Sequence, residues 1–428
     1  MKVNFRQELV SMRSLLCGVI VFVVCLSSVV WAGPNCQVAA REGVTWTFLE
    51  GDCRKGLAHG KGKAKDSKKH TYEGDFVDGV MQGKGIFIWP SKARYEGGFV
   101  QGEFDGLGVY IRSNGERYDG QWKANLRDGK GTYKAVDGVV YEGQWQQDKM
   151  SGQGTLRWPS GQTYVGSFSE GMQHGQGRMI WPDGRSYQGE FRDGKMHGKG
   201  DLFLPDGRKY EGEWKEDQRS GQGVYTWPDG RRYEGQWAAG KPHGQGTKTW
   251  ASGRKFEGAW KSGKRCGQGK LTAPDGAVDE GVFVDGKLQG HGKMTGSDGG
   301  VYEGEFVADV KHGAGTYRWP DGKTYEGNWR KDKRHGQGKM TWPDGWKYEG
   351  QWENDQRNGR GTMLSPTGEK YMGGFKNNKR HGKGTLDLPD GSKYIGPFRE
   401  DKPHGRGVQV TPDGREVKGR WKNGQPVQ

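Results

Sequence analysis

The sequence predicts an all-β protein, an elongated single-layer twisted antiparallel sheet of about 16 tandem β-hairpins. Three observations predict this fold. The 428 residues include 79 glycines, well above the ordinary share of about 7%. Aromatic residues are abundant, with 18 Trp, 17 Tyr and 15 Phe. A motif returns every 23 residues without insertion or deletion, and such a fixed period is typical of repeat architectures.

The composition excludes several other classes. Only 31% of the residues are hydrophobic, and many of these are aromatic, so an ordinary globular core is not expected. Disordered chains are poor in aromatic residues, which disfavours disorder. A collagen-like Gly-X-Y period is absent. What remains is a set of short repeated strands rich in Gly and aromatic side chains.

Three positions define each repeat. Seventeen repeat starts fit the period, from Leu49 to Val417, and all seventeen have Gly two positions later. Four positions after the start, sixteen of the seventeen have Trp or Phe, and Cys53 is the exception. We expect these positions to form the structural core of the repeats, as in Tyr72, Gly74, Trp122, Tyr141, Gly143, Trp145, Tyr187, Gly212, Trp214, Tyr233, Gly235, Trp237, Tyr325, Gly327, Trp329, Tyr348, Gly350 and Trp352.

Each repeat is predicted to contain two strands and a turn. In residues 233–237, Tyr-Glu-Gly-Gln-Trp, the aromatic and polar residues alternate, which places the rings on one face of a strand. A second strand follows the recurrent Gly-x-Gly. Residues 181–184, Trp-Pro-Asp-Gly, combine residues typical of a tight turn. Gly235 is expected to let a ring of a neighbouring strand lie flat on the backbone, so Gly235→Val should weaken the packing.

The motif Tyr-Glu-Gly-x-Trp followed by His-Gly-x-Gly resembles the membrane occupation and recognition nexus (MORN) repeat. The resemblance covers residues 49–428. It implies a file of antiparallel β-hairpins in one long twisted sheet, the arrangement that the alternation also predicts. The sequence departs from the pattern at Leu49 with Cys53, at Asp279 with Gly296, and in the truncated unit from Val417. We interpret these departures as caps or a local kink.

The amino terminus predicts export. Residues 15–32 carry no charge and follow Lys2, Arg6 and Arg13, the pattern of a signal peptide spanning residues 1–32 with cleavage before Gly33. An uncleaved anchor over residues 15–32 is the alternative, and Met12 is an alternative start. Residues 33–48 are then a cap segment and residues 49–428 the repeat array. We expect a bacterial protein that is periplasmic or secreted, or anchored in the inner membrane by residues 15–32.

The cysteines fit an oxidising compartment. Cys36 and Cys53 could form a disulfide that fastens the cap segment to the first repeat. Cys266 would remain free or form an intermolecular bond. Loss of a Cys36–Cys53 peptide on reduction, detected by mass spectrometry, would support the pairing.

No catalytic, metal or cofactor site is expected. Eight of the ten histidines occupy one repeat position, about 10 Å apart in successive repeats, which is too far to share a metal with bonds of about 2 Å. The Gly-x-Gly segments lack a following helix for phosphate binding. The Asp-Gly turns lack the carboxylates of a calcium loop. Only residues 33–48 lie outside both the signal and the repeats, so an enzyme is not expected.

The net charge of +15 has two interpretations. It could attract anionic lipid, glycan or an acidic partner, or it could belong to a solvated polar face, which the even spread of charge over the repeats favours. Nucleic acid is not expected as a partner. The predicted function is a non-catalytic exported scaffold that binds an unknown protein at the cell envelope, with self-association as one form of this. The alternative is a peripheral membrane module that recognises anionic phospholipid headgroups.

Overall fold

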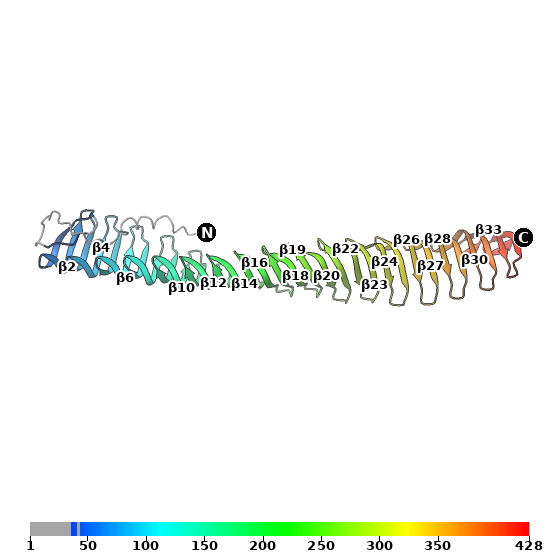
Figure 1. Cartoon of the computed structure of the whole chain (residues 1–428), viewed down its shortest axis with the longest axis horizontal. Helices are drawn as coiled ribbons and strands as arrows, with labels where there is room; N and C mark the ends of the chain where they lie inside the picture. Colours follow the sequence, from blue (N-terminus) through cyan, green and yellow to red (C-terminus); the bar gives the residue numbers. More distant parts are fainter. Residues whose placement is uncertain (1–35, 41–42, 428) are drawn as a thin grey trace. The chain divides into compact units, whose positions relative to one another are not determined.

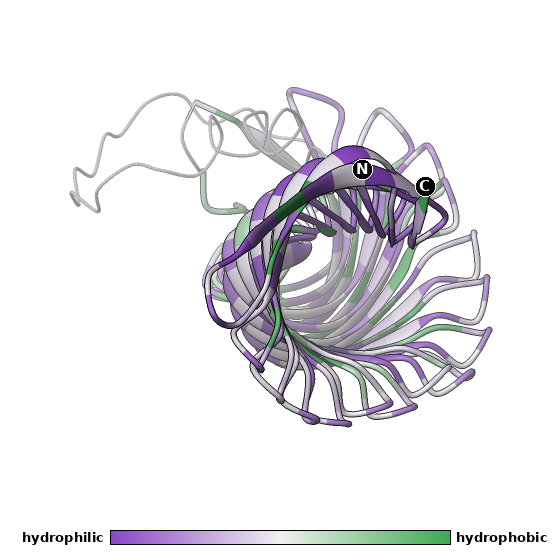
Figure 2. Ribbon diagram, turned by 90° about the vertical axis from the view of Figure 1, so that its right-hand side faces the viewer, coloured by the Kyte–Doolittle hydropathy of each residue, from purple (hydrophilic) through white to green (hydrophobic). Residues whose placement is uncertain are grey.

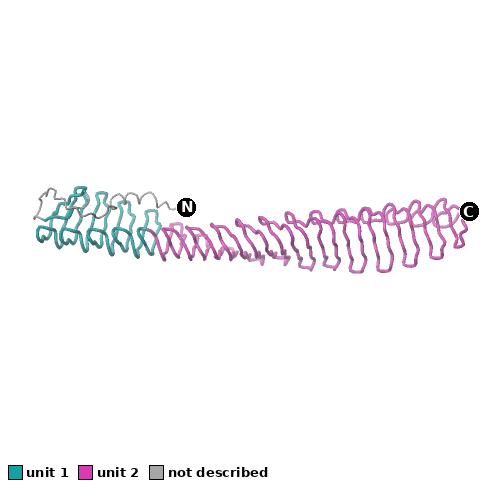
Figure 3. The backbone as a smooth tube through the Cα atoms, viewed as in Figure 1, with its two compact units in different colours: residues 1–148 teal, residues 149–428 magenta. Residues whose placement is uncertain are grey.

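The computed structural model describes residues 36–40 and 43–427 of the chain. These residues form 35 β-strands and no helix, and the paired strands run antiparallel. The predicted all-β fold of tandem hairpins is thereby confirmed. The chain divides into two compact units, residues 1–148 and residues 149–428 (Figure 3). The predicted signal peptide or anchor, residues 1–32, lies outside the described residues.

In unit 1 each strand pairs with the next strand along the chain (Figure 1). The strands of this unit are β1 (Trp46–Arg54), β2 (Leu57–Asp66), β3 (Thr71–Val77), β4 (Val80–Ile88), β5 (Arg94–Val100), β6 (Glu103–Ile111), β7 (Arg117–Lys123), β8 (Leu126–Lys134) and β9 (Val140–Gln146).

Unit 2 continues the same plan over more repeats. Its strands are β10 (Lys149–Arg157), β11 (Thr163–Ser169), β12 (Met172–Ile180), β13 (Ser186–Arg192), β14 (Lys195–Phe203), β15 (Lys209–Lys215), β16 (Gln218–Thr226), β17 (Arg232–Ala238), β18 (Lys241–Thr249), β19 (Lys255–Lys261), β20 (Lys264–Thr272), β21 (Val278–Val284), β22 (Lys287–Thr295), β23 (Val301–Val307), β24 (Val310–Arg318), β25 (Thr324–Arg330), β26 (Lys333–Thr341), β27 (Lys347–Glu353), β28 (Gln356–Leu364), β29 (Lys370–Lys376), β30 (Lys379–Asp387), β31 (Lys393–Arg399), β32 (Lys402–Pro403), β33 (Gly405–Val410), β34 (Glu416–Lys422) and β35 (Gln425–Val427).

Two kinds of turn alternate along each unit. Within a repeat, a two-residue turn such as Asp193-Gly194 has positive φ at both residues, 50° and 78°, as a type I′ hairpin turn requires. Between repeats, Gly184 adopts a φ of 85°, and its N–H donates to the carbonyl of Trp181 at 3.0 Å. The Asp183 carboxylate accepts the N–H of Arg185 at 3.1 Å. The turn predicted at residues 181–184 is confirmed.

The two faces of the sheet differ as the alternation predicts. On β17, Tyr233 and Trp237 are 1% and 5% exposed, whereas Glu234 and Gln236 are exposed. In Figure 2, hydrophilic and hydrophobic bands alternate along the strands of unit 2 nearest the viewer, and these strands are visibly bent across their length.

Aromatic side chains build the core of each unit as a ladder of rings. Within a unit, a Tyr at a repeat start meets, edge to face, the Trp or Phe of its own repeat and that of the following repeat. Tyr210, for example, lies 5.1 Å from Trp214 and 5.3 Å from Trp237 between ring centroids. Edge-to-face packing at such distances is the favoured geometry of aromatic pairs. In unit 2 the ladder is interrupted where Asp279 replaces the aromatic residue.

In the first repeat the buried core residue comes one position earlier than the period predicts. Leu49, the predicted first core residue, is 44% exposed, whereas Phe48 is 2% exposed. The register of β1 against β2 shifts between Phe48 and Glu50, and this irregularity turns Phe48 toward the core. The Phe48 ring lies 5.7 Å from Phe76 and takes the place of the usual Tyr. β1 therefore includes residues that the sequence assigned to the cap segment, 33–48.

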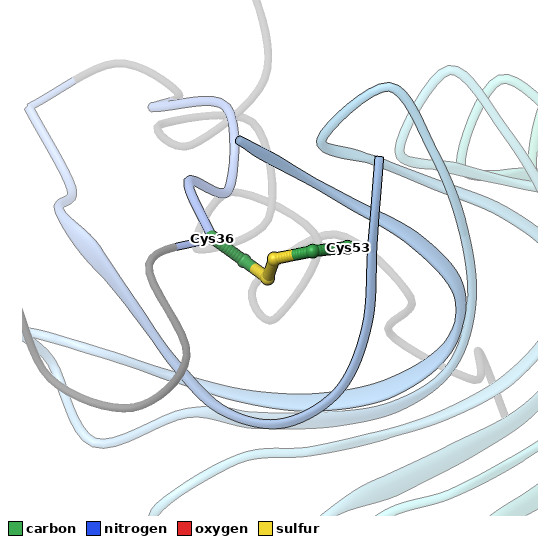
Figure 4. Close-up of a disulfide and its surroundings, with 2 residues drawn as sticks. All are labelled: Cys36 and Cys53. Atoms are coloured by element: carbon green, nitrogen blue, oxygen red, sulfur yellow. A yellow bond between two sulfur atoms is a disulfide. The ribbon is translucent and has the colours of Figure 1, made fainter. Parts of the chain in front are cut away.

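Residues 36–40 hold to unit 1 through main-chain hydrogen bonds and a disulfide. The N–H of Gln37 donates to the carbonyl of Gly56, and that of Ala39 to the carbonyl of Gly79, both at 2.8 Å. Cys36 and Cys53 form a disulfide, with Cα atoms 5.7 Å apart (Figure 4). Cys53 thus has a cross-link where the other repeats have a ring.

At the carboxyl end, β34 is not the last strand. The short β35 pairs with β34 over Arg420–Lys422. Trp421 lies opposite Pro426, which has no N–H to offer a further strand.

Candidate functional site

The predicted repeat-core residues occupy equivalent places and form a buried, hydrogen-bonded frame. The tyrosine hydroxyl donates to the main-chain carbonyl three residues later, as from Tyr187 to Glu190 at 3.0 Å and from Tyr348 to Gln351 at 2.9 Å. Burial raises the pKa of Tyr348 to about 12, because the charged form would lose its hydration. The frame contains these residues on β3, β7, β9, β13, β15, β17, β25 and β27: Tyr72, Trp122, Tyr141, Trp145, Tyr187, Trp214, Tyr233, Trp237, Tyr325, Trp329, Tyr348 and Trp352.

Paired glycines make room for each ring. Gly350 on β27 faces Gly361 on β28, and a Cβ at Gly361 would lie 2.6 Å from Cε2 of Tyr348. The neighbouring-strand ring thus lies on the second-strand glycine. The sequence predicted that a ring lies flat on Gly235, which is a first-strand glycine. A Cβ at Gly235 would instead lie 2.5 Å from the Gln245 carbonyl oxygen and 3.1 Å from the Tyr233 hydroxyl. The same hairpin pairing includes Gly74, Gly212 and Gly327, and Gly143 lies opposite Gly131 of the preceding repeat.

The tryptophans also bridge consecutive repeats. The Trp352 indole N–H donates to the Gly338 carbonyl at 3.1 Å, and that of Trp214 donates to the Gly200 carbonyl at 2.9 Å. A buried indole usually finds such a partner. Seven tryptophans of the ladder make this polar link between repeats.

A row of cations lies on the aromatic face. Nine positions after the repeat start, opposite the Trp or Phe of the hairpin, seven repeats carry Arg or Lys with the charged group over the rings. Arg334, for example, has its guanidinium carbon 4.4 Å from the Trp352 ring centroid. The row consists of Arg127 in unit 1 and of Arg219, Arg265, Lys311, Arg334, Arg357 and Arg380 in unit 2.

These cations were missed because the sequence argument placed Lys and Arg on the polar face. That assignment is wrong for this row. The register of the hairpin could have revealed the row. The residue nine positions after the repeat start lies opposite the Trp or Phe of the same hairpin, as Arg357 lies opposite Trp352. An arginine can lie over a ring because its planar guanidinium stacks on aromatic faces.

A pocket of about 370 Å³ opens on this face in unit 2. It draws on four consecutive repeats, from the turn after β24 to the turn before β30. Three tryptophans and two arginines dominate its walls. The lining residues are Trp319, Lys323, Arg334, Met340, Trp342, Trp352, Asp355, Arg357 and Asn378.

The two arginines of the pocket differ in charge balance. Arg334 donates from Nε to the Asp355 carboxylate at 3.0 Å. Arg357 donates from Nη2 to the Asn378 carbonyl at 2.7 Å, and among the described residues no carboxylate forms an ion pair with it. Burial lowers the pKa of the Arg357 guanidinium, since the charged group is removed from water. The pocket therefore offers one cation without an anionic partner.

The histidines behave as parts of the turns and strands. His59 lies 3.4 Å from Asp78, and His174 lies 3.7 Å from Asp193. His335, His381 and His404 have a buried Nδ1 without a hydrogen-bond partner. Within residues 36–40 and 43–427, no group of three His, Cys, Asp or Glu side chains is placed to hold a metal ion. Cys266, on β20, is a free thiol.

The architecture is that of a tandem β-hairpin repeat protein. The MORN repeat model matches 15 segments of the chain: residues 72–94, 95–117, 118–140, 141–163, 164–184, 187–207, 210–231, 233–253, 256–278, 280–301, 302–324, 325–347, 348–370, 371–393 and 394–414. These segments make up well over half of the chain, so the chain belongs to the MORN repeat family.

No curated protein matches the chain. Among solved structures, the TCP domain of Drosophila melanogaster SAS-4 in complex with a proline-rich motif of Ana2 is 12% identical, covers 36% of this chain and 85% of its own, and has a TM-score of 0.25. The wild-type TCP10 domain of Danio rerio CPAP is 14% identical over 52% of this chain and 96% of its own, with a TM-score of 0.20. TM-scores this low carry no information on function.

Among the residues that the structure describes, no helix has the length and apolar character needed to cross a membrane.

Proposed function

We propose that this chain is a non-catalytic scaffold, exported to the cell envelope, whose repeats bind another protein. Membership of the MORN family supports the coarser statement that the chain is a repeat scaffold or binding module. The observation that carries the proposal is the pocket on the aromatic face of unit 2, where rings and a cation without an anionic partner are accessible. Aromatic residues and Arg are the side chains most enriched at protein interfaces.

The polar face supports a protein partner over a lipid surface. Many of its cations already pair with a carboxylate on the same face, as Lys209 pairs with Glu211 at 2.6 Å and Lys255 with Glu257 at 2.8 Å. Charges neutralised in this way contribute little to long-range attraction of anionic headgroups. A peripheral membrane module that binds anionic phospholipid is the second candidate, because the chain as a whole carries a net charge of +15.

Two measurements on the purified protein separate these functions. In vesicle flotation, we expect no binding to anionic or neutral vesicles at physiological salt. Cross-linking in the native envelope, followed by capture, should yield a protein partner with the wild-type chain and less of it with Arg357→Met. Headgroup-selective flotation at physiological salt would contradict the scaffold and favour the membrane module. Equal capture by the wild type and Arg357→Met would show that Arg357 does not contribute to partner binding.

A further inference from the structure

Arginines cover some of the turn tryptophans of unit 2. After the turns of Trp181, Trp227 and Trp250, the next residue is an arginine that lies over the Trp ring at the start of the turn. The guanidinium carbon of Arg185 is 5.1 Å from the Trp181 ring centroid, and that of Arg231 is 5.2 Å from the Trp227 ring centroid. Each cation occupies the ring face that a ligand would otherwise use.

At the pocket no arginine follows the turn. The residue after the turn of Trp319 is Lys323, which pairs with Asp321 at 2.8 Å. The residue after the turn of Trp342 is Trp346, which brings no charge. In the described part of the chain, no ring or cation packs against the Trp342 ring. The Trp319 ring is covered in part, since Tyr317 packs 4.4 Å from it and the Arg334 guanidinium carbon lies 6.0 Å from its centroid. Both tryptophans are half-buried and line the pocket, so equivalent rings of consecutive repeats meet a ligand there.

The spacing of these rings selects an extended peptide. Equivalent residues of consecutive repeats are separated by two strands, which is about 9.6 Å in the hydrogen-bonding direction of a sheet. A polyproline II helix rises about 3.1 Å per residue with three residues per turn, so residues three apart recur every ~9.3 Å on one side. Prolines at that spacing can therefore contact Trp319 and Trp342 together. Aromatic-lined grooves are the usual receptors for this conformation.

The charge of the pocket adds a second requirement. Arg357 lies over the rings of Tyr348 and Phe375, 5.6 Å and 5.5 Å from their centroids. It has no carboxylate partner among the described residues, whereas the Asp355 carboxylate is already engaged by Arg334. A partner that supplies a carboxylate would complete the hydrogen bonding of the Arg357 guanidinium.

We propose that this pocket binds a polyproline II segment of a partner protein, with two prolines three residues apart on Trp319 and Trp342 and an acidic side chain at Arg357. The inference rests on the proposed function, because it assumes a protein partner. The segment runs across the strands, from one repeat to the next, and contributes no strand to the sheet.

The test is fluorescence anisotropy of a labelled peptide of repeated Pro-Glu-Ala triplets with the full chain. The double variant Trp319→Leu, Trp342→Leu should bind it at least about tenfold more weakly than the wild type. Leu is compatible with the fold at this position, since Leu204 and Leu388 occupy it in other repeats. The matched control, Trp181→Leu with Trp227→Leu, changes rings that arginines already cover and should bind like the wild type.

The acidic contact is tested separately. Arg357→Met should lose the preference for the Pro-Glu-Ala peptide over a Pro-Gln-Ala peptide. Met is found at the equivalent position in Met81, Met150 and Met196, so folding should be retained. The matched control is Arg219→Met, at the same repeat position outside the pocket, which should keep the preference.

Three results would overturn the inference. One is equal affinity of the pocket variants and the control variants, and another is equal binding of a peptide with a Pro-Glu-Ala-Ala quartet. The third is a pocket that binds polygalacturonate and not the peptide, which would assign it to an acidic glycan. If the peptide fails while cross-linking still captures a partner, the inference is wrong and the proposed scaffold function stands. If neither occurs, both are wrong.

Discussion

Two repeats of unit 2 each have a pair of facing glycines, but only one of them has a ring over the pair. In the repeat that begins at Tyr348, the ring lies over the paired Gly350 and Gly361 and meets Trp352 and Phe375 at 5.2 Å and 5.0 Å. The repeat that begins at Asp279 keeps the corresponding pair, Gly281 opposite Gly292, without a ring above it.

The interrupted repeat fills the space only in part. Leu288 is 1% exposed, and a Cβ at Gly281 would lie 2.8 Å from its Cδ1 atom. Asp279 is half-buried, and without a ring at this position the two edge-to-face contacts that Tyr348 makes in its own repeat have no counterpart at Phe283 and Phe306. The hairpin register is nevertheless retained. The comparison teaches that main-chain pairing sets the architecture, while the ladder of rings supplies stability to it.

Removing a ring from the continuous repeat should have the largest effect. We expect Tyr348→Ala to lower the local free energy of opening of β27 and β28 by about 3–5 kcal/mol, the range for loss of a large buried aromatic side chain. Asp279→Ala is the matched control and should cost less than about 1 kcal/mol. Amide hydrogen exchange of the two hairpins measures both. Equal losses would contradict the stabilising role of the ladder.

Restoring the missing ring should stabilise the interrupted repeat. Asp279→Tyr would place a ring over glycines that are already present, in reach of Phe283 and Phe306. Burial of the ring and two edge-to-face contacts should raise the local free energy of opening by about 2 kcal/mol. Asp279→Leu, which adds apolar surface without ring contacts, should gain less. Hydrogen exchange of β21 and β22 reports the gain, and a loss with Tyr would mean that Leu288 has taken the space.

The interrupted repeat should also respond to pH. Burial raises the pKa of the Asp279 carboxyl from 3.8, and the nearby Asp309 adds to this while Arg254 and Arg265 oppose it. The folded state then holds the proton longer than the unfolded state does, so stability falls as pH rises through the window between the two pKa values. Above that window, we expect the free energy of unfolding of the wild type to be lowest in comparison with that of Asp279→Asn.

Denaturant unfolding of both chains at about pH 3 and about pH 8 checks this sign. The difference between the two chains should be small at the lower pH, where the carboxyl is protonated in both states. A difference that does not change with pH would contradict the prediction.

The smallest effect on stability is expected at the cation of the continuous repeat. Arg357→Met should change the local free energy of opening by less than about 1 kcal/mol, because the hydrogen bond to Asn378 is lost while the cost of burying a charge is removed. Hydrogen exchange of β28 and β29 is the measurement. A loss near that of Tyr348→Ala would show that the cation row is part of the structural frame.

Much of the fold was predictable from the sequence because each repeat contains its own strands and turns. The alternation in residues 233–237 and the turn residues at 181–184 determine strand, face and turn locally. The burial of Phe48 in place of Leu49 was not predictable, because the irregularity that turns Phe48 inward depends on pairing with β2. No local pattern reports such a shift.

The pocket could not have been predicted in the same way. Its lining comes from four consecutive repeats, and the stacking of Arg185 on Trp181, which the residues after the pocket's turns do not repeat, is known only from the structure. The row of cations was recoverable in principle from the register that places Arg357 opposite Trp352. The assumption that charged residues lie on the polar face concealed it.

The strict chain-order pairing of the strands has a consequence for how such a protein is made and changed. Every hairpin finds its partners in the hairpins just before and after it, so its contacts are local in sequence, a property associated with rapid folding. Folding can begin at any repeat and spread to its neighbours, including on a chain that is still being synthesised. A duplicated stretch of 23 residues would arrive with its partners already beside it, so the array can lengthen by copying without any change elsewhere.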